Sequence, residues 1–466
     1  MENMLSTFWN RHKIILKSLW IGFLILLFLI PNVFIQNLVS ERQDRQQQAV
    51  TEINSRWAGP QTVTGPVIGI PYTETITDAG HAQEVKKWAY FLPGKLDIQA
   101  HIVPEKRYRG IYQVIVYTTE LQIRGSYDSL HLAELNIPAE RILWGESAVF
   151  FDVKDVQGLK EDVIIHFAGV NGNSRGSGSG GVKPDEGVDL SLVPAKFSTE
   201  QFKNALSAGM PVDLAMKRGP LEFSSTVRLK GSGNLLFVPT GKETRVGANS
   251  SWPNPSFAGS YLPDWRTVKD SGFVANWKVL YLNRQFPQQW KQGIFDLDGA
   301  AFGVSLLVPV DSYQQTTRSV KYAILIILLT FTAFFLIEWI CEKPIHSMQY
   351  LLAGIALCLF YTLLLSFSEY TGFNAAYGIA SLATIGLIAW YVGSMLRSSR
   401  LSLLIALLLA VQYGFVFTLI QLQDYALLVG SVGLFITLAL VMYFSRKIKW
   451  EQVAPVVRKD AGTASA

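Results

Sequence analysis

The chain has 466 residues, of which 49% are hydrophobic and 17% are charged, and its formal net charge is +5. That excess is small and lies mainly at the ends of apolar stretches, which excludes the concentrated basic face of a nucleic-acid-binding protein. The length allows more than one folded unit.

One apolar stretch lies near the N-terminus, and five more follow one another in the C-terminal part of the chain. Each holds about 20 residues, the length that an α-helix needs to cross a hydrocarbon core roughly 30 Å thick. Only a helix satisfies its own backbone hydrogen bonds there. We therefore predict six transmembrane helices, at residues 19–39, 321–341, 348–367, 374–394, 401–420 and 425–444.

The first span reads as an uncleaved anchor, because its apolar region is longer than that of a signal peptide and no small-residue cleavage site follows. Pro31 lies inside it and predicts a kink. Residues 41–57 are polar and rich in glutamine, and they predict a helical stalk that Gly59 and Pro60 end.

Basic residues mark one side of the membrane. They are Arg11, Lys13, Lys17, Lys343, Arg397, Arg400, Arg446, Lys447 and Lys449, whereas the short loops on the other side carry Glu369 and Asp424. Since Lys and Arg favour the cytoplasmic side of short loops, we expect a cytoplasmic N-terminus (1–18), a cytoplasmic tail (445–466) and an external, periplasmic domain (40–320). Arg42, Arg45, Arg318 and Lys321 argue weakly against this topology.

The external domain is predicted to be mainly β and sandwich-like, and it is long enough for two packed modules. Residues 221–229 alternate apolar and polar side chains, and a Gly-Ser-Gly turn predicts a hairpin with 235–238. Residues 67–77 are expected to pair with 84–92, and Ile115, Tyr117, Leu121 and Ile123 form the inward face of another strand. Further strands are expected at 148–153, 163–167, 273–282 and 301–308, and one helix at 198–207.

No pattern in the sequence predicts a metal site, a cofactor or a catalytic centre. The histidines lack metal-ligand spacing, and Cys341 and Cys358 lie in or beside the spans without histidine neighbours. The glycines from Gly172 to Gly181 lack the context of a phosphate-binding loop and indicate a surface loop. Aromatic residues are frequent in the external domain, where filling a β core is a more common role than binding a ligand.

Polar residues inside spans are the best pointers to function in a membrane protein. Glu338 lies one turn from the cytoplasmic end of the second span, where a paired structural carboxylate and a functional one are both open readings, with Lys343 nearby. Glu369 lies at the outer end of the third span, where we expect access to water. Gln412 lies in the middle of the fifth span and could bind a neighbouring helix.

Several long strings resemble the CreD family of inner-membrane proteins. They are GPVIGIPY (65–72), SWPNPSFAGSYLP (251–263), SGFVANW (271–277), RSVKYAILIILLTFTAFFLIE (318–338) and MQYLLAGIALCLFYTLLLSFSEYTGF (348–373). The resemblance implies a bacterial inner-membrane protein linked to envelope integrity, to a two-component sensory system and to responses to envelope-acting antibiotics or colicins. It supplies no catalytic residue, cofactor or ligand. In the second string, Trp252, Pro253 and Pro255 are expected to fix an extended turn between strands.

Three functions stay open at this point. The first is a scaffold or binding protein whose external β domain contacts an envelope protein, a peptidoglycan or lipid component, or a second copy. The second is a lipid or small-molecule conduit built by the C-terminal spans, and the third is an enzyme that acts on envelope polymers. Membrane lipids are expected partners and nucleic acid is not, while the oligomeric state cannot be read from the sequence.

Overall fold

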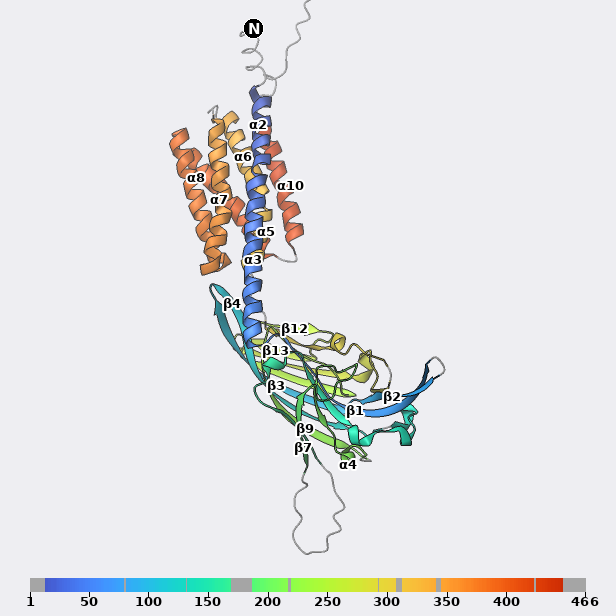
Figure 1. Cartoon of the computed structure of the whole chain (residues 1–466). Helices are drawn as coiled ribbons and strands as arrows, with labels where there is room; N and C mark the ends of the chain where they lie inside the picture. The colour runs from blue at the N-terminus through green and yellow to red at the C-terminus, as the bar shows by residue number, and fades with distance from the viewer. Residues whose placement is uncertain are drawn as a thin grey trace, which may run out of the picture. The chain divides into compact units, whose positions relative to one another are not determined.

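The computed structural model describes residues 13–78, 81–130, 132–168, 187–216, 219–291, 293–306, 312–340, 345–422 and 425–446. The chain divides into two compact units. Met1–Gln46 and Val310–Ala466 form one, here called the membrane unit, and Gln47–Pro309 form the other, here called the β domain (Figure 1). The loop from Gly172 to Gly181 lies outside the described residues.

The first span is formed by two consecutive helices, α2 (Lys13–Leu27) and α3 (Leu29–Trp57). The break lies at Phe28, three residues before Pro31. Proline has no N–H, so the carbonyl of Leu27 loses the donor that a regular helix would give it. Helix α3 then runs through the polar stretch and ends at Trp57, just before Gly59 and Pro60, which confirms the predicted stalk.

The C-terminal helices are α5 (Ser312–Lys321), α6 (Ala323–Ile340), α7 (Ser347–Thr371), α8 (Phe373–Leu396), α9 (Ser399–Gln421) and α10 (Ala426–Ser445). Five helices of the described chain, counting the N-terminal one, are long and apolar enough to cross a membrane, and the number reaches six if the bent pair α5 and α6 is one span. The axes of that pair differ by 41°. The predicted class, a polytopic helical membrane protein with an inserted mainly-β domain, is therefore confirmed.

Aromatic rings and one glycine bring the helices of the membrane unit together. The Phe360 ring of α7 contacts Tyr377 of α8 and Tyr413 of α9, with centroids 5.3 and 4.5 Å apart. The Tyr377 hydroxyl donates to the Tyr413 carbonyl at 2.8 Å. A Cβ on Gly354 of α7 would lie 2.2 Å from the Phe28 ring, so a larger residue would displace this ring where the first span approaches α7.

The β domain is built on one long, curled sheet. Its strands are β1 (Gln61–Asp78), β2 (His81–Phe91), β3 (Lys95–Arg109), β4 (Tyr112–Tyr127), β5 (Ala148–Val153), β6 (Val163–Phe167), β7 (Val188–Pro194), β8 (Leu206–Gly209), β9 (Leu221–Ser232), β10 (Asn234–Phe237), β11 (Glu243–Ser250), β12 (Pro255–Gly259), β13 (Trp265–Lys269), β14 (Gly272–Leu280), β15 (Gln289–Trp290) and β16 (Phe302–Leu306). A short helix, α4, spans Val212–Ala215. The strand order is β12-β16-β10-β1-β5-β8-β7-β6-β9-β4-β3-β11-β14-β13, with β2 and β15 branching from β1.

Alternating side chains place the core between the layers of this sheet. In β4 the residues Ile115, Tyr117, Leu121 and Ile123 are buried, as the alternation predicted. Strands β1 and β2 form the expected hairpin, with Ile68 opposite Phe91 and Thr77 opposite Ala82. Strands β5 and β6 have the predicted bounds, β16 lies within its predicted range, and β14 begins one residue before its predicted range and ends two residues before the end of it.

The hairpin predicted between residues 221–229 and 235–238 is wrong. Strand β9 pairs with β4 and β6, whereas β10 pairs with β1 and β16. Gly233 between them has φ of +64°, a conformation that glycine adopts without strain. The glycine redirects the chain from one layer to the other instead of folding it back on itself.

The helix predicted at 198–207 is also wrong. Its last residues form β8, and the preceding turn inserts Phe202 into the core, where its ring stacks on Phe150 at 5.2 Å. Gln201 does not cap a helix but exchanges two hydrogen bonds of 2.9 Å with the backbone of Phe295. Burial of Phe202 and pairing of β8 with β5 and β7 outweigh the local capping pattern.

Candidate functional site

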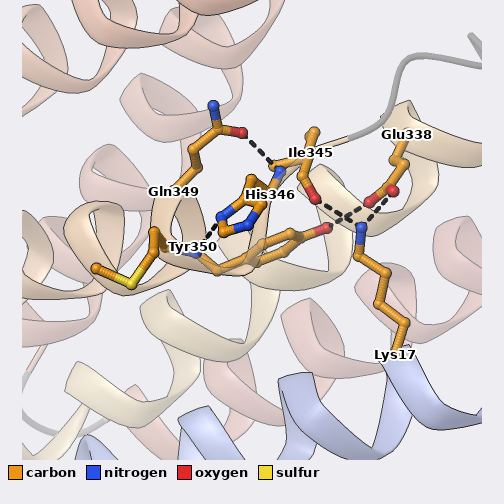
Figure 2. Close-up of polar contacts among 7 residues, drawn as sticks. Lys17, Glu338, Ile345, His346, Gln349 and Tyr350 are labelled. Atoms are coloured by element: carbon orange, nitrogen blue, oxygen red, sulfur yellow. Dashed lines mark hydrogen bonds and ion pairs between the residues drawn. The ribbon is translucent and has the colours of Figure 1, made fainter.

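Glu338 is the centre of a buried polar cluster in the membrane unit. It lies in the last turn of α6 and is 9% exposed. Lys17 of α2 forms an ion pair with one carboxylate oxygen, and the Tyr350 hydroxyl of α7 donates to the other at 3.2 Å (Figure 2). The Lys17 ammonium also donates to the carbonyl of Ile345 at 2.6 Å. One carboxylate therefore ties together three helices.

The beginning of α7 positions this cluster. The His346 side chain accepts a hydrogen bond from the Met348 N–H at 3.3 Å, and the Gln349 side chain accepts one from the His346 N–H at 2.8 Å. This reciprocal arrangement satisfies backbone donors at the helix start. Figure 2 shows the cap beside the Lys17 and Glu338 pair, with the Ile345 carbonyl directed at the ammonium.

Glu369 forms a second cluster near the other end of α7. Its carboxylate accepts a hydrogen bond from the Tyr313 hydroxyl of α5 at 3.1 Å, and it lies 3.7 Å from Arg42 Nε of α3. The Glu369 side chain is only 9% exposed, so the expectation that water reaches it freely is wrong. The Arg42 side chain is 39% exposed.

The two clusters share a design but not a location. Each joins a cation of the first span, a carboxylate of the C-terminal helices and a tyrosine hydroxyl. Tyr350 and Glu369 are 19 positions apart on α7, which separates the clusters by about 28 Å along the helix. Gln412 of α9 lies elsewhere and accepts a hydrogen bond from Thr330 of α6 at 3.2 Å.

The ion pairs and hydrogen bonds of Glu338 and Glu369 are typical of contacts that hold helices together, and less so of a reactive centre. A cation and a hydroxyl on each carboxylate lower the cost of holding the charge inside the protein. No group of three or more His, Cys, Asp or Glu side chains that could hold a metal ion occurs among the described residues. Cys358 is buried and forms no disulfide.

In the β domain, Trp252 packs in the main hydrophobic core and is 7% exposed. Its indole N–H donates to the carbonyl of Asn254 at 3.1 Å, across Pro253. Pro255 then begins strand β12. A proline at the first position of an edge strand costs no ladder hydrogen bond. Trp252 and the two prolines therefore hold the entry into β12.

Strands β12 and β13 are the two ends of the sheet order, and only residues 260–264 separate them in the chain. The Arg266 guanidinium of β13 lies 5.3 Å from the centroid of the Phe257 ring of β12. Between the strands is a groove of about 600 Å³, lined by Pro255, Ser256, Phe257, Arg266 and Val268. We call this groove the seam. The sheet therefore curls until its two ends face each other without a backbone ladder between them.

Sequence reasoning missed the partners of both carboxylates. In the sequence, Lys17 and Arg42 appear only as charges that flank the first span, and Lys343, the basic residue near Glu338 in the chain, lies outside the described residues. It also missed Arg284, which is 7% exposed and donates to the carbonyls of Thr240 and Pro287 at 3.5 and 3.3 Å and to the Gln288 side chain. Burial lowers the pKa of Arg284 to about 10. No spacing in the sequence marks this residue.

Comparison with known proteins agrees with this architecture. The family described as Inner membrane protein CreD matches residues 13–451. A relative from Escherichia coli (strain K12), also described as Inner membrane protein CreD, is 33% identical over 434 residues, which are 91% of each chain. With its apolar helices, the match identifies an inner-membrane protein with several spans. The chain belongs to the CreD family of inner membrane proteins.

Proposed function

We propose that this protein supports the integrity of the bacterial cell envelope, and the response to envelope stress, by binding a partner through its β domain. The observation that carries the proposal is the seam. Two strand edges that face each other without a ladder leave backbone groups for another molecule, a feature that β proteins normally cover or blunt. The neighbouring surface is also apolar, with Leu262 71% exposed and Trp265 55% exposed.

The polar residues of the membrane unit also favour binding by the β domain over transport through the helices. Glu338, Glu369 and Gln412 each contact a side chain from another helix, and the two carboxylates lie near opposite ends of α7. A conduit for polar molecules would need polar groups that face a common path. The contacts of these three residues instead favour a membrane unit that anchors the β domain.

We also propose the orientation. Arg397 and Arg400 flank the junction of α8 and α9, and Arg446 follows α10. Glu369 instead lies near the C-terminal end of α7, beside the junction of α7 and α8. Under the preference of basic residues for the cytoplasm, both termini lie inside, and residues 40–320 lie in the periplasm. Neither the family description nor that of the relative names a reaction, and the proposal assigns none.

The test is leakage of a periplasmic marker from an envelope-stressed null strain. The strain carries either the intact protein or a neutral-pair variant with Lys17→Met, Glu338→Gln, Arg42→Met and Glu369→Gln, at equal membrane levels. Replacing both members of each pair leaves no lone charge. We expect the neutral-pair variant to protect like the intact protein. Leakage equal to that of the null strain would reject the scaffold assignment and favour a conduit that depends on these charges.

A further inference from the structure

The seam has the geometry of an acceptor for one extended segment. Strand β12 pairs with β16 and β13 pairs with β14, and no ladder joins β12 to β13. Adding a strand to such an edge gains main-chain hydrogen bonds, while pockets beside it select side chains. Here the groove is lined by residues of both edge strands, so a segment paired with one edge would also lie beside the other strand.

The register of β13 shows which side chains enter the seam. Arg266 pairs with Ala275 and Val268 pairs with Phe273. Directly opposed residues share one face of a sheet, and both partners are buried in the core. Val268 is nevertheless 47% exposed. Phe257 covers part of this face beside Arg266 and Phe273, but Val268 stays partly uncovered, and an apolar side chain of a ligand would cover it.

The charge of the seam is positive. The Arg266 guanidinium lies over the Phe257 ring, and among the described residues no carboxylate lies within ion-pair distance of it. Asp264 and Asp270 flank β13 in the chain, but neither lines the groove. A guanidinium over an aromatic ring keeps N–H groups available for a carboxylate.

We infer that the seam binds an extended segment of a partner protein that carries an acidic side chain. The backbone of the segment pairs with the free edge of β13, its carboxylate binds Arg266, and a neighbouring apolar side chain packs on Val268. The inference rests on the proposed function, since it names the partner class for the binding assigned to the β domain.

The test uses the full-length protein in intact cells, with a photoreactive amino acid in place of Val268. The matched control has the same substitution at Val274, which is 43% exposed on the neighbouring strand β14. Val274 lies between the buried Phe273 and Ala275 and so points to the outer face. We expect crosslinking to a protein from position 268 at least tenfold above that from position 274, with the crosslinked peptide containing Asp or Glu within a few residues of the attachment point.

Charge reversal separates a specific site from general stickiness. Arg266→Glu should reduce crosslinking from position 268 at least tenfold, while Arg124→Glu, at another exposed strand position, should not change it. Absence of crosslinking, or crosslinking to lipid, to glycan or to a second copy, would overturn the inference, as would insensitivity to Arg266→Glu. If the crosslinking experiment fails while the intact protein still prevents leakage, the proposed function stands and the partner binds elsewhere.

Discussion

The two units hold buried charge in different ways. In the membrane unit, Glu338 has a cation and a hydroxyl from two other helices. In the β domain, Arg284 is as deeply buried but binds carbonyl oxygens and stacks on the Phe286 ring at 4.3 Å. Both arrangements join distant segments, since Lys17 lies 321 positions from Glu338 and Thr240 lies 44 positions from Arg284, but only the first uses an opposite charge. In the membrane unit, a buried charge is therefore balanced by an opposite charge, whereas in the β domain it is held by carbonyl oxygens and an aromatic ring.

This comparison predicts that the β domain is most sensitive to lost apolar volume. Trp252→Ala removes a buried ring and should lower the free energy of unfolding by about 3–5 kcal/mol. Thermal or denaturant unfolding of the full-length protein in detergent micelles measures it. Trp265→Ala is the matched control, because that ring is 55% exposed and its loss should cost less than about 0.5 kcal/mol. Equal effects of the two substitutions would contradict the assigned core.

The membrane unit should be most sensitive to an unpaired charge. Glu338→Ala leaves Lys17 without its carboxylate and should cost about 3 kcal/mol, since removing one member of a buried pair is strongly destabilising. Adding Lys17→Met should recover most of the loss. Arg400→Ala, at an exposed position, serves as the control. If the double variant is no more stable than Glu338→Ala, the pair is not the tie described here.

The second cluster should matter less than the first. Glu369→Gln keeps an acceptor for the Tyr313 hydroxyl and loses only the charge facing Arg42, which is partly exposed at 3.7 Å. We expect a loss of about 0.2–1 kcal/mol. A double-mutant cycle with Arg42→Gln measures the coupling. A coupling energy as large as that between Lys17 and Glu338 would show that exposure does not weaken this pair.

A carboxylate of the β domain gives the smallest effect and a pH dependence. Burial, and then the nearby Asp298 charge, raise the pKa of Asp152. A raised folded-state pKa means that ionised Asp152 costs stability above that pKa, and that the cost vanishes below the unfolded value of about 3.9. Asp152→Asn should therefore stabilise the domain at pH 7 by less than about 1 kcal/mol, and the gain should shrink as the pH falls toward 4. If Asp152→Asn stabilised the domain equally at pH 7 and near pH 4, the raised pKa of Asp152 would not be the cause of the effect.

Much of the fold was readable from periodic patterns. Apolar length revealed the spans, and alternation revealed strands such as 163–167, because burial of one face imposes that period. The errors occurred where tertiary contacts override local signals. A Gly-Ser-Gly sequence suits a hairpin turn, but Gly233 sends the chain to another layer. A capping pattern near Ser198 suits a helix, but the core takes up Phe202.

The site was only half readable. Glu338 and Glu369 were visible as carboxylates in apolar surroundings, yet their cations come from the first span, with Lys17 lying 321 positions from Glu338 in the chain. No local spacing encodes such a pairing. The seam was also invisible, because it depends on which strands end the sheet. Only the closeness of β12 and β13 in the chain hinted that the ends of the sheet meet.

Protection of the envelope is assigned to the seam of the β domain and not to the charges of the two clusters in the membrane unit. Marker leakage from a stressed null strain tests it most directly, with the neutral-pair variant and an Arg266→Glu, Val268→Lys seam variant compared at equal membrane levels. We expect the neutral-pair variant to protect like the intact protein and the seam variant to leak like the null strain. Protection by the seam variant together with leakage by the neutral-pair variant would contradict this assignment.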